Sequence, residues 1–130
     1  MNFDIVDTMV RMAADAIRNS YTEHGGIAAG ACVLSSDGAL YSGCSVDHPE
    51  TVLNYSAEVV AMLRAVSDGK REFDALAVVA DIDGTYIPDE DSWMFMKEFE
   101  VEKIILADLE GDVKILNLDE IEPYKPRRRN

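Results

Sequence analysis

Apolar side chains recur with helical periodicity in three segments of the chain. In residues 4–19 they stand three or four positions apart, which predicts an amphipathic helix. A second helix is predicted over residues 56–67, where Asp68-Gly69 stops it, and a third begins at Pro88-Asp89. The apolar positions of the first helix are Val6, Met9, Val10, Ala13, Ala16 and Ile17, and the third carries Trp93, Phe95, Met96 and Phe99.

Short apolar runs between these segments predict strands. Residues 27–34 and 40–46 flank the tight-turn signal Ser36-Asp37-Gly38, which predicts a hairpin. The continuous apolar runs at 75–80 and 103–107 are typical of strands that are covered on both faces. A further short strand is predicted at 113–116 and one helical turn at 119–122.

The element order α-β-β-α-β-α-β-β-α predicts an α/β fold with a layered, mixed sheet of about five strands. We expect residues 1–124 to form a single domain, followed by a basic C-terminal tail, residues 125–130, that contains three arginines.

The negative net charge of the chain makes some classes of binding partner unfavourable. The 25 acidic and 12 basic residues give a net charge of −13, which argues against binding to a nucleic-acid backbone. No apolar run approaches the roughly 18 residues of a membrane span, and the N-terminus lacks the basic region of a secretory signal. Cys32 and Cys44 are predicted to be free thiols. These features favour a cytoplasmic protein that binds neither nucleic acid nor membranes.

The starts of the second and third helices carry the chemistry. Ser56-Ala57-Glu58 opens one, and Pro88-Asp89-Glu90-Asp91-Ser92 opens the other. In zinc deaminases the corresponding helices begin with His/Cys-Ala-Glu and with Pro-Cys-x-x-Cys. The stretches Gly30-Ala31, Ser36-Asp37-Gly38, residues 41–47, residues 65–73 and Ile121-Glu122-Pro123 follow the family pattern in the same order.

The chain therefore resembles the cytidine deaminase family of the small homotetrameric type. Pointers to its blasticidin S deaminase branch are Ser35-Ser36-Asp37-Gly38, Val46-Asp47-His48 and Ala57-Glu58-Val59-Val60. The resemblance implies a three-layer α/β/α sandwich and makes Glu58 the candidate catalytic proton shuttle. It also implies a homo-oligomer, a dimer or a tetramer.

The departures from the family lie at the zinc positions. The three ligands correspond to Ser56, Asp89 and Ser92, and serine hydroxyls that stay protonated near neutral pH are poor zinc ligands. We therefore expect no metal and no cofactor. Without a metal to lower the pKa of water, Glu58 alone would face a much higher barrier, and each ~1.4 kcal/mol is a tenfold loss of rate.

Two interpretations of the helix starts remain open at this point. In the first, Ser56 and Asp89 are simply good N-caps of a degenerated site. In the second, the cavity persists and binds a ligand through Ser56, Ala57, Pro88 and Asp89, with Glu58 beside it.

The positions that hold the ribose in the family correspond to Ser45 and Asp47, and an aromatic position corresponds to Ile27. We expect a binder of a nucleoside-like small molecule or a non-catalytic, regulatory paralogue. The alternative is a hydrolase, a cytidine or blasticidin S-type deaminase that uses Glu58 with an atypical metal or none.

Overall fold

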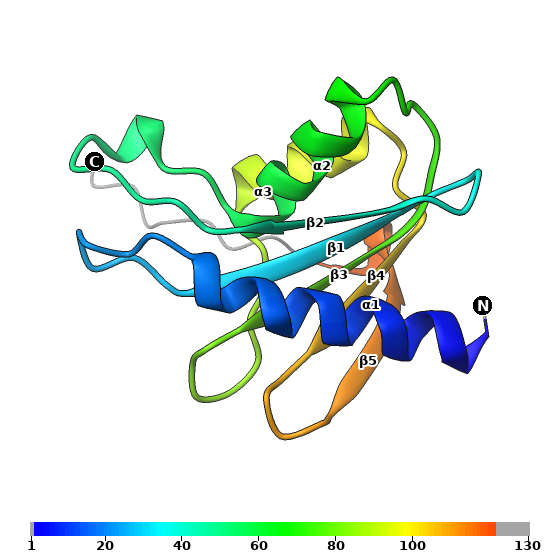
Figure 1. The fold of residues 1–130 in the computed structure, drawn as a ribbon, viewed down its shortest axis with the longest axis horizontal. Helices are drawn as coiled ribbons and strands as arrows, with labels where there is room; N and C mark the ends of the chain where they lie inside the picture. The colour runs from blue at the N-terminus through cyan, green and yellow to red at the C-terminus, as the bar shows by residue number, and fades with distance from the viewer. Residues whose placement is uncertain (1, 122–130) are drawn as a thin grey trace.

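A five-stranded mixed sheet with the strand order β2-β1-β3-β4-β5 forms the centre of the computed structural model, which describes residues 2–121 (Figure 1). β1 pairs antiparallel with β2 and β3, β3 pairs parallel with β4, and β4 pairs antiparallel with β5. The elements are α1 (Phe3–Ala16), β1 (Ala29–Ser35), β2 (Leu40–Cys44), α2 (Ala57–Ser67), β3 (Phe73–Ala80), α3 (Glu90–Glu98), β4 (Lys103–Ala107) and β5 (Val113–Asn117).

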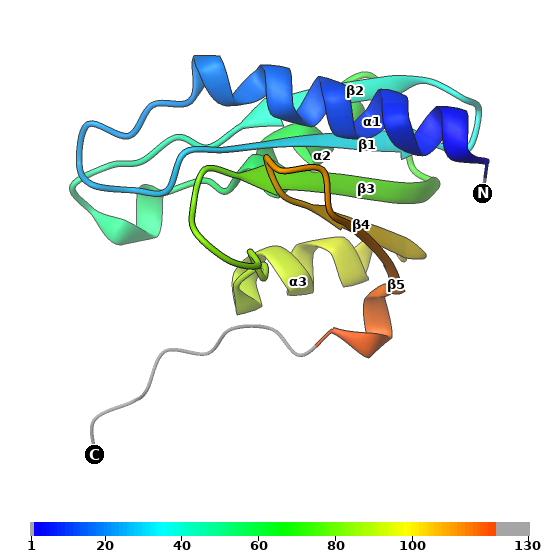
Figure 2. The same ribbon diagram turned by 90° about the horizontal axis from the view of Figure 1, so that it is seen from below.

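Helices cover both faces of this sheet. α1 lies on one face, and α2 and α3 lie on the other (Figures 1 and 2). Two buried clusters fill the two interfaces: Met9 and Cys32 belong to the α1 side, and Met62 and Met96 to the α2 and α3 side. The prediction of a three-layer α/β/α sandwich with about five strands is confirmed.

Two glycines let the helices approach the sheet. A Cβ on Gly30 would lie 1.8 Å from the carbonyl oxygen of Ala13 in α1, and a Cβ on Gly43 would lie 2.4 Å from the amide nitrogen of Ala61 in α2. Only a residue without a side chain fits at these two contacts. Gly43 therefore fixes how closely α2 sits on β2.

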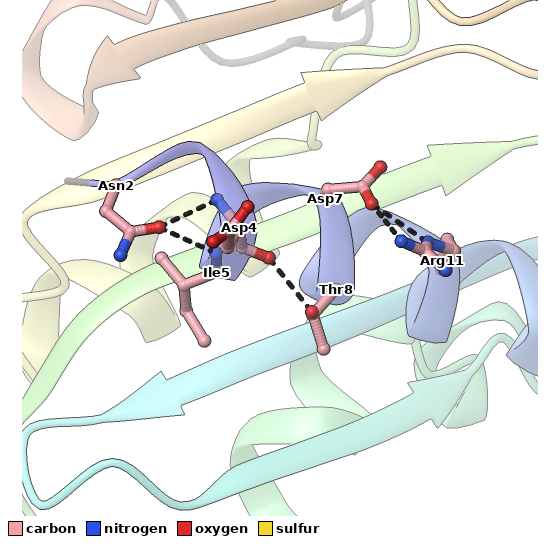
Figure 3. A network of polar contacts seen from close by, with 6 residues as sticks. All are labelled: Asn2, Asp4, Ile5, Asp7, Thr8 and Arg11. Atoms are coloured by element: carbon pink, nitrogen blue, oxygen red, sulfur yellow. Dashed lines mark hydrogen bonds and ion pairs between the residues drawn. The ribbon is translucent and has the colours of Figure 1, made fainter.

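The start of α1 is an exposed polar network (Figure 3). Asn2 Oδ1 accepts hydrogen bonds from the amides of Asp4 at 2.7 Å and Ile5 at 3.2 Å, which satisfies two of the free N–H groups at a helix start. One turn later Arg11 pairs with Asp7. The helix predicted over 4–19 ends as a separate 3₁₀ turn at Ile17–Asn19.

Three further expectations concern the chain as a whole. Cys32 and Cys44 are free thiols, and burial raises the pKa of Cys32 to about 11. Among the helices that the structure describes, none has the length and apolar composition needed to cross a membrane. The predicted tail at 125–130 and the end of the predicted domain at 122–124 lie outside the described residues.

Candidate functional site

Two loops at one end of the sheet are held together by backbone hydrogen bonds. The amide of Tyr21, after α1, donates to Ser45 O at 2.9 Å, and the amide of Val46 donates to Tyr55 O at 2.9 Å. These bonds form isolated bridges from Val46 to Tyr21 on one side and to Tyr55 on the other. The loop before β1 and the loop before α2 therefore lie side by side, at the end of the sheet that points left in Figure 1.

A pocket of about 330 Å³ opens between these loops and the segment before α3. It gathers five of the seven site residues that the sequence predicts, although they come from three separate segments. Those five are Ser45, Asp47, Ser56, Ala57 and Asp89. The other two, Pro88 and Glu58, are fully buried and are not part of the pocket wall.

The starts of α2 and α3 meet at the inner side of this pocket. Ser56 caps α2 by accepting the amide N–H of Val59 at 3.2 Å, and Asp89 caps α3 by accepting the amide N–H of Ser92 at 2.8 Å. The two caps are joined, because the Ser92 hydroxyl donates to Ser56 Oγ at 2.7 Å. Ser56, Asp89 and Ser92 thus form one cluster. Ser56 and Asp89 make the N-cap contacts that the first of the two interpretations expects.

Glu58 lies directly behind this cluster, in the first turn of α2. Its side chain is fully buried, and neither carboxylate oxygen makes a hydrogen bond with any of the described residues. Desolvation raises the pKa of Glu58 above its ordinary value. The hydroxyls of Tyr86 and Ser56 lie near enough to oppose that shift in part, while burial and the Glu58 carboxylate raise the pKa of Tyr86.

Asp47 and Ser45 support the outer side of the pocket. Asp47 Oδ2 accepts the amides of His24 at 3.0 Å and Gly26 at 2.9 Å, whereas Asp47 Oδ1 is buried and lacks a partner among the described residues. The Ser45 hydroxyl accepts the amide of Ala29 at 3.0 Å and donates to Ile27 O at 2.8 Å. Both side chains therefore hold the loop before β1 in place, and Ser45 uses its only proton to do so.

Sequence reasoning missed the three tyrosines of the pocket wall, Tyr21, Tyr55 and Tyr86. Ile27, which the resemblance matches to an aromatic position, also lines the pocket, and the aromatic side chains of the wall come from other segments. Tyr55 lies beside the Ser56-Ala57-Glu58 motif and could have been found by its position. Tyr21 and Tyr86 carry no such signal, because only the folded loops bring them to the pocket.

A mixed five-stranded sheet, with two helix starts meeting beside a buried glutamate, defines a cytidine deaminase-like fold. The solved structure of cytidine deaminase from Burkholderia pseudomallei matches it with a TM-score of 0.82 at 24% identity, over 92% of this chain and 95% of that one.

Similarity in sequence extends over most of the chain. Cytidine deaminase from Sporosarcina psychrophila is 32% identical over 111 residues, 84% of this chain and 82% of that protein. Cytidine deaminase from Halalkalibacterium halodurans is 28% identical over 117 residues, 88% of this chain and 89% of that protein. No protein-family profile matches the chain. The chain belongs to the cytidine deaminase family.

This membership corrects the prediction that the protein has no cofactor. The relatives and the structural neighbours are cytidine deaminases, and deaminases of this kind depend on zinc, so the comparisons point to zinc. The prediction is wrong because it inferred the absence of any cofactor from the side chains at three positions alone.

The residues at those three positions do not themselves fit a zinc ion. Two of the three donors, Ser56 and Ser92, are hydroxyls that hydrogen-bond to each other, and the third is one carboxylate, Asp89. Within residues 2–121, no group of three or more His, Cys, Asp or Glu side chains is arranged to hold a metal ion. The donor set and the family's cofactor therefore disagree.

Proposed function

We propose that this protein binds a nucleoside-like small molecule in the pocket between the two loops and the start of α2. The observation that carries the proposal is that one pocket brings together Ser45, Asp47, Ser56, Ala57 and Asp89. Family membership supports it, because the relatives are named for a reaction of cytidine.

Different residues of the pocket wall suit the sugar and the base of such a ligand. Asp47 borders the pocket, and its Oδ1 is buried and without a partner among the described residues, so a sugar hydroxyl that reaches Oδ1 would supply the missing hydrogen bond. Tyr55 and Tyr86 offer ring surfaces on which a base can stack, and Ser56 adds a hydroxyl. Glu58 and Pro88 are buried and do not line the pocket.

Titration calorimetry with cytidine, uridine, their 2′-deoxy forms and blasticidin S tests this proposal. We expect saturable binding of at least one nucleoside, and at least about tenfold weaker binding by Asp47→Asn, which corresponds to about 1.4 kcal/mol. Asp108→Asn is the matched control, since Asp108 also accepts two backbone amides, those of Glu110 and Asp112, but lies away from the pocket. Absence of binding across the panel, or an equal loss in Asp108→Asn, contradicts the proposal.

The second candidate function is hydrolytic deamination of cytidine or of a blasticidin S-type substrate. The observation that favours it is the Ser56-Ala57-Glu58 motif, which by resemblance makes Glu58 the candidate proton shuttle, in a chain 32% identical to a protein named cytidine deaminase. In this reaction Glu58 would carry a proton between water and the leaving amino group. In the structure Glu58 is fully buried and does not line the pocket, so direct contact with a substrate needs a rearrangement of the pocket wall.

Ammonia release from cytidine and from blasticidin S, measured together with the elemental content of protein purified without chelator, tests this second candidate. Stoichiometric zinc and ammonia release that Glu58→Gln abolishes would establish deamination. Ligand binding without ammonia release at any metal content would favour a binding or regulatory role, with Ser56, Asp89 and Ser92 as replaced ligands.

We also propose a homo-oligomer, a dimer or a tetramer, and a cytoplasmic protein that does not bind nucleic acid. The net charge of −13 supports the absence of nucleic-acid binding. The exposed apolar side chains of Val52 and Leu53, in the loop that leads to the pocket residue Tyr55, support a subunit contact. Sedimentation velocity tests the oligomer: a monomer at all concentrations would contradict it.

A further inference from the structure

The hydroxyl of Ser56 has its acceptor capacity filled. Its Oγ accepts the amide of Val59 at 3.2 Å and the hydroxyl of Ser92 at 2.7 Å. A hydroxyl has two acceptor lone pairs and one proton, so these two bonds leave Ser56 only its own proton. With the Ser92–Ser56 bond in this direction, the Ser56 proton is used by neither Ser92 nor Val59, and it can go to the neighbouring Glu58 carboxyl or to a ligand in the pocket.

Ser92 itself does not face the pocket. Its side chain is 1% exposed and is not part of the pocket wall, whereas Ser56 is. Any effect of Ser92 on a bound molecule therefore passes through Ser56. α3 supplies this hydroxyl from one helical turn inside its own cap, where Asp89 already holds the Ser92 amide.

We propose that Ser92 is a positioning residue that makes Ser56 a donor-only group, so that the pocket selects a pyrimidine nucleoside with a carbonyl facing Ser56 over one with an amino group there. This inference rests on the proposed binding of a nucleoside. In that proposal the sugar hydroxyls reach Asp47 and the base lies beside Ser56, which belongs to a different segment of the pocket wall. Asp89 also lines the pocket, but it is exposed to solvent, which screens its charge, so we expect it to discriminate less between the two bases.

The affinities for uridine and cytidine, which differ by this exchange of a carbonyl for an amino group, test the selectivity. We expect the wild-type protein to bind uridine at least about threefold more tightly. Ser92→Thr and Ser92→Val add the same bulk, and only threonine keeps a hydroxyl. We expect Ser92→Thr to retain the uridine preference and Ser92→Val to lose it. Equal ratios in all three proteins, or a fall of both affinities by one common factor, would overturn the proposal.

A measurement without ligand separates this inference from the proposed function. In thermal unfolding, Ser92→Thr should be more stable than Ser92→Val in the wild-type background and equally stable once Ser56→Ala removes the acceptor. Ser35→Thr and Ser35→Val are the control pair, because Ser35 is also buried but contacts Glu72 O. The difference in stability between these two variants should be the same with and without Ser56→Ala. No difference between threonine and valine at 92 overturns the link itself. A link without binding of either nucleoside overturns the selectivity together with the proposed function.

Discussion

The N-termini of α1 and α2 are both capped by a side-chain oxygen and both carry an acidic residue in the first turn. At α1 the cap is Asn2 and the acidic residue, Asp4, is exposed (Figure 3). At α2 the cap is Ser56 and the acidic residue, Glu58, is 0% exposed. The same local motif is exposed to water at α1, whereas at α2 its cap lines a candidate binding site and its carboxylate is buried behind the wall. Burial, not the motif, makes the difference, because a buried carboxylate cannot be solvated.

The largest expected loss of stability comes from substituting the glycines at which α1 and α2 contact the sheet. Gly30→Ala places a Cβ against backbone of α1, and Gly43→Ala places one against backbone of α2. Because backbone cannot turn aside as a side chain does, we expect both to destabilise by at least the upper end of about 1–3 kcal/mol. Chemical denaturation measures this loss. Only Gly43→Ala should also weaken nucleoside binding at temperatures where the protein is folded, and an equal loss in Gly30→Ala would contradict the separation of the two faces.

The buried acidic residue, Glu58, should make the stability of the protein depend on pH. The pKa of Glu58 is raised from its ordinary value of 4.5, so the folded state holds a proton that the unfolded state releases, and the protein loses stability as pH rises above that value. Glu58→Gln should therefore gain stability over the wild type above pH 4.5, by up to about 1.4 kcal/mol per pH unit until Glu58 ionises.

Unfolding curves of the two proteins across this range check the sign. Asp4→Asn is the control. It should lose about 0.3–1 kcal/mol of stability instead of gaining any, because it removes an exposed negative charge that interacts favourably with the helix dipole. A difference between Glu58→Gln and the wild type that does not change with pH would show that Glu58 is solvated.

The smallest expected difference is between the losses of stability caused by removing the two N-caps. Asn2→Ala should cost about 1 kcal/mol, the ordinary value for a lost N-cap. Ser56→Ala should cost about 1 kcal/mol more than that, because it also leaves the buried Ser92 hydroxyl without its acceptor. Equal costs in thermal or chemical unfolding would indicate that the Ser92 hydroxyl has found another partner.

The sequence was sufficient for the fold because its signals are local. The period of Val6, Met9 and Ala13 predicts α1, and the turn at residues 36–38 predicts the β1–β2 hairpin, both of which the structure contains. The motif order from Gly30 to Ser92 also predicted the family. Boundaries shifted by one to three residues where capping decided them, as at Ser56 and Asp89, which precede their helices.

Tertiary structure alone decided what the site residues face. Pro88 and Glu58 stand in the predicted motif yet lie behind the pocket wall, while Tyr21 and Tyr86 lie in it without any motif. The hydrogen bond from Ser92 to Ser56 joins residues 36 positions apart and depends on how α3 packs beside α2. Periodicity and caps are properties of neighbouring residues, so the sequence determined them by itself. Burial and the direction of a hydroxyl depend on segments that only the folded chain brings together.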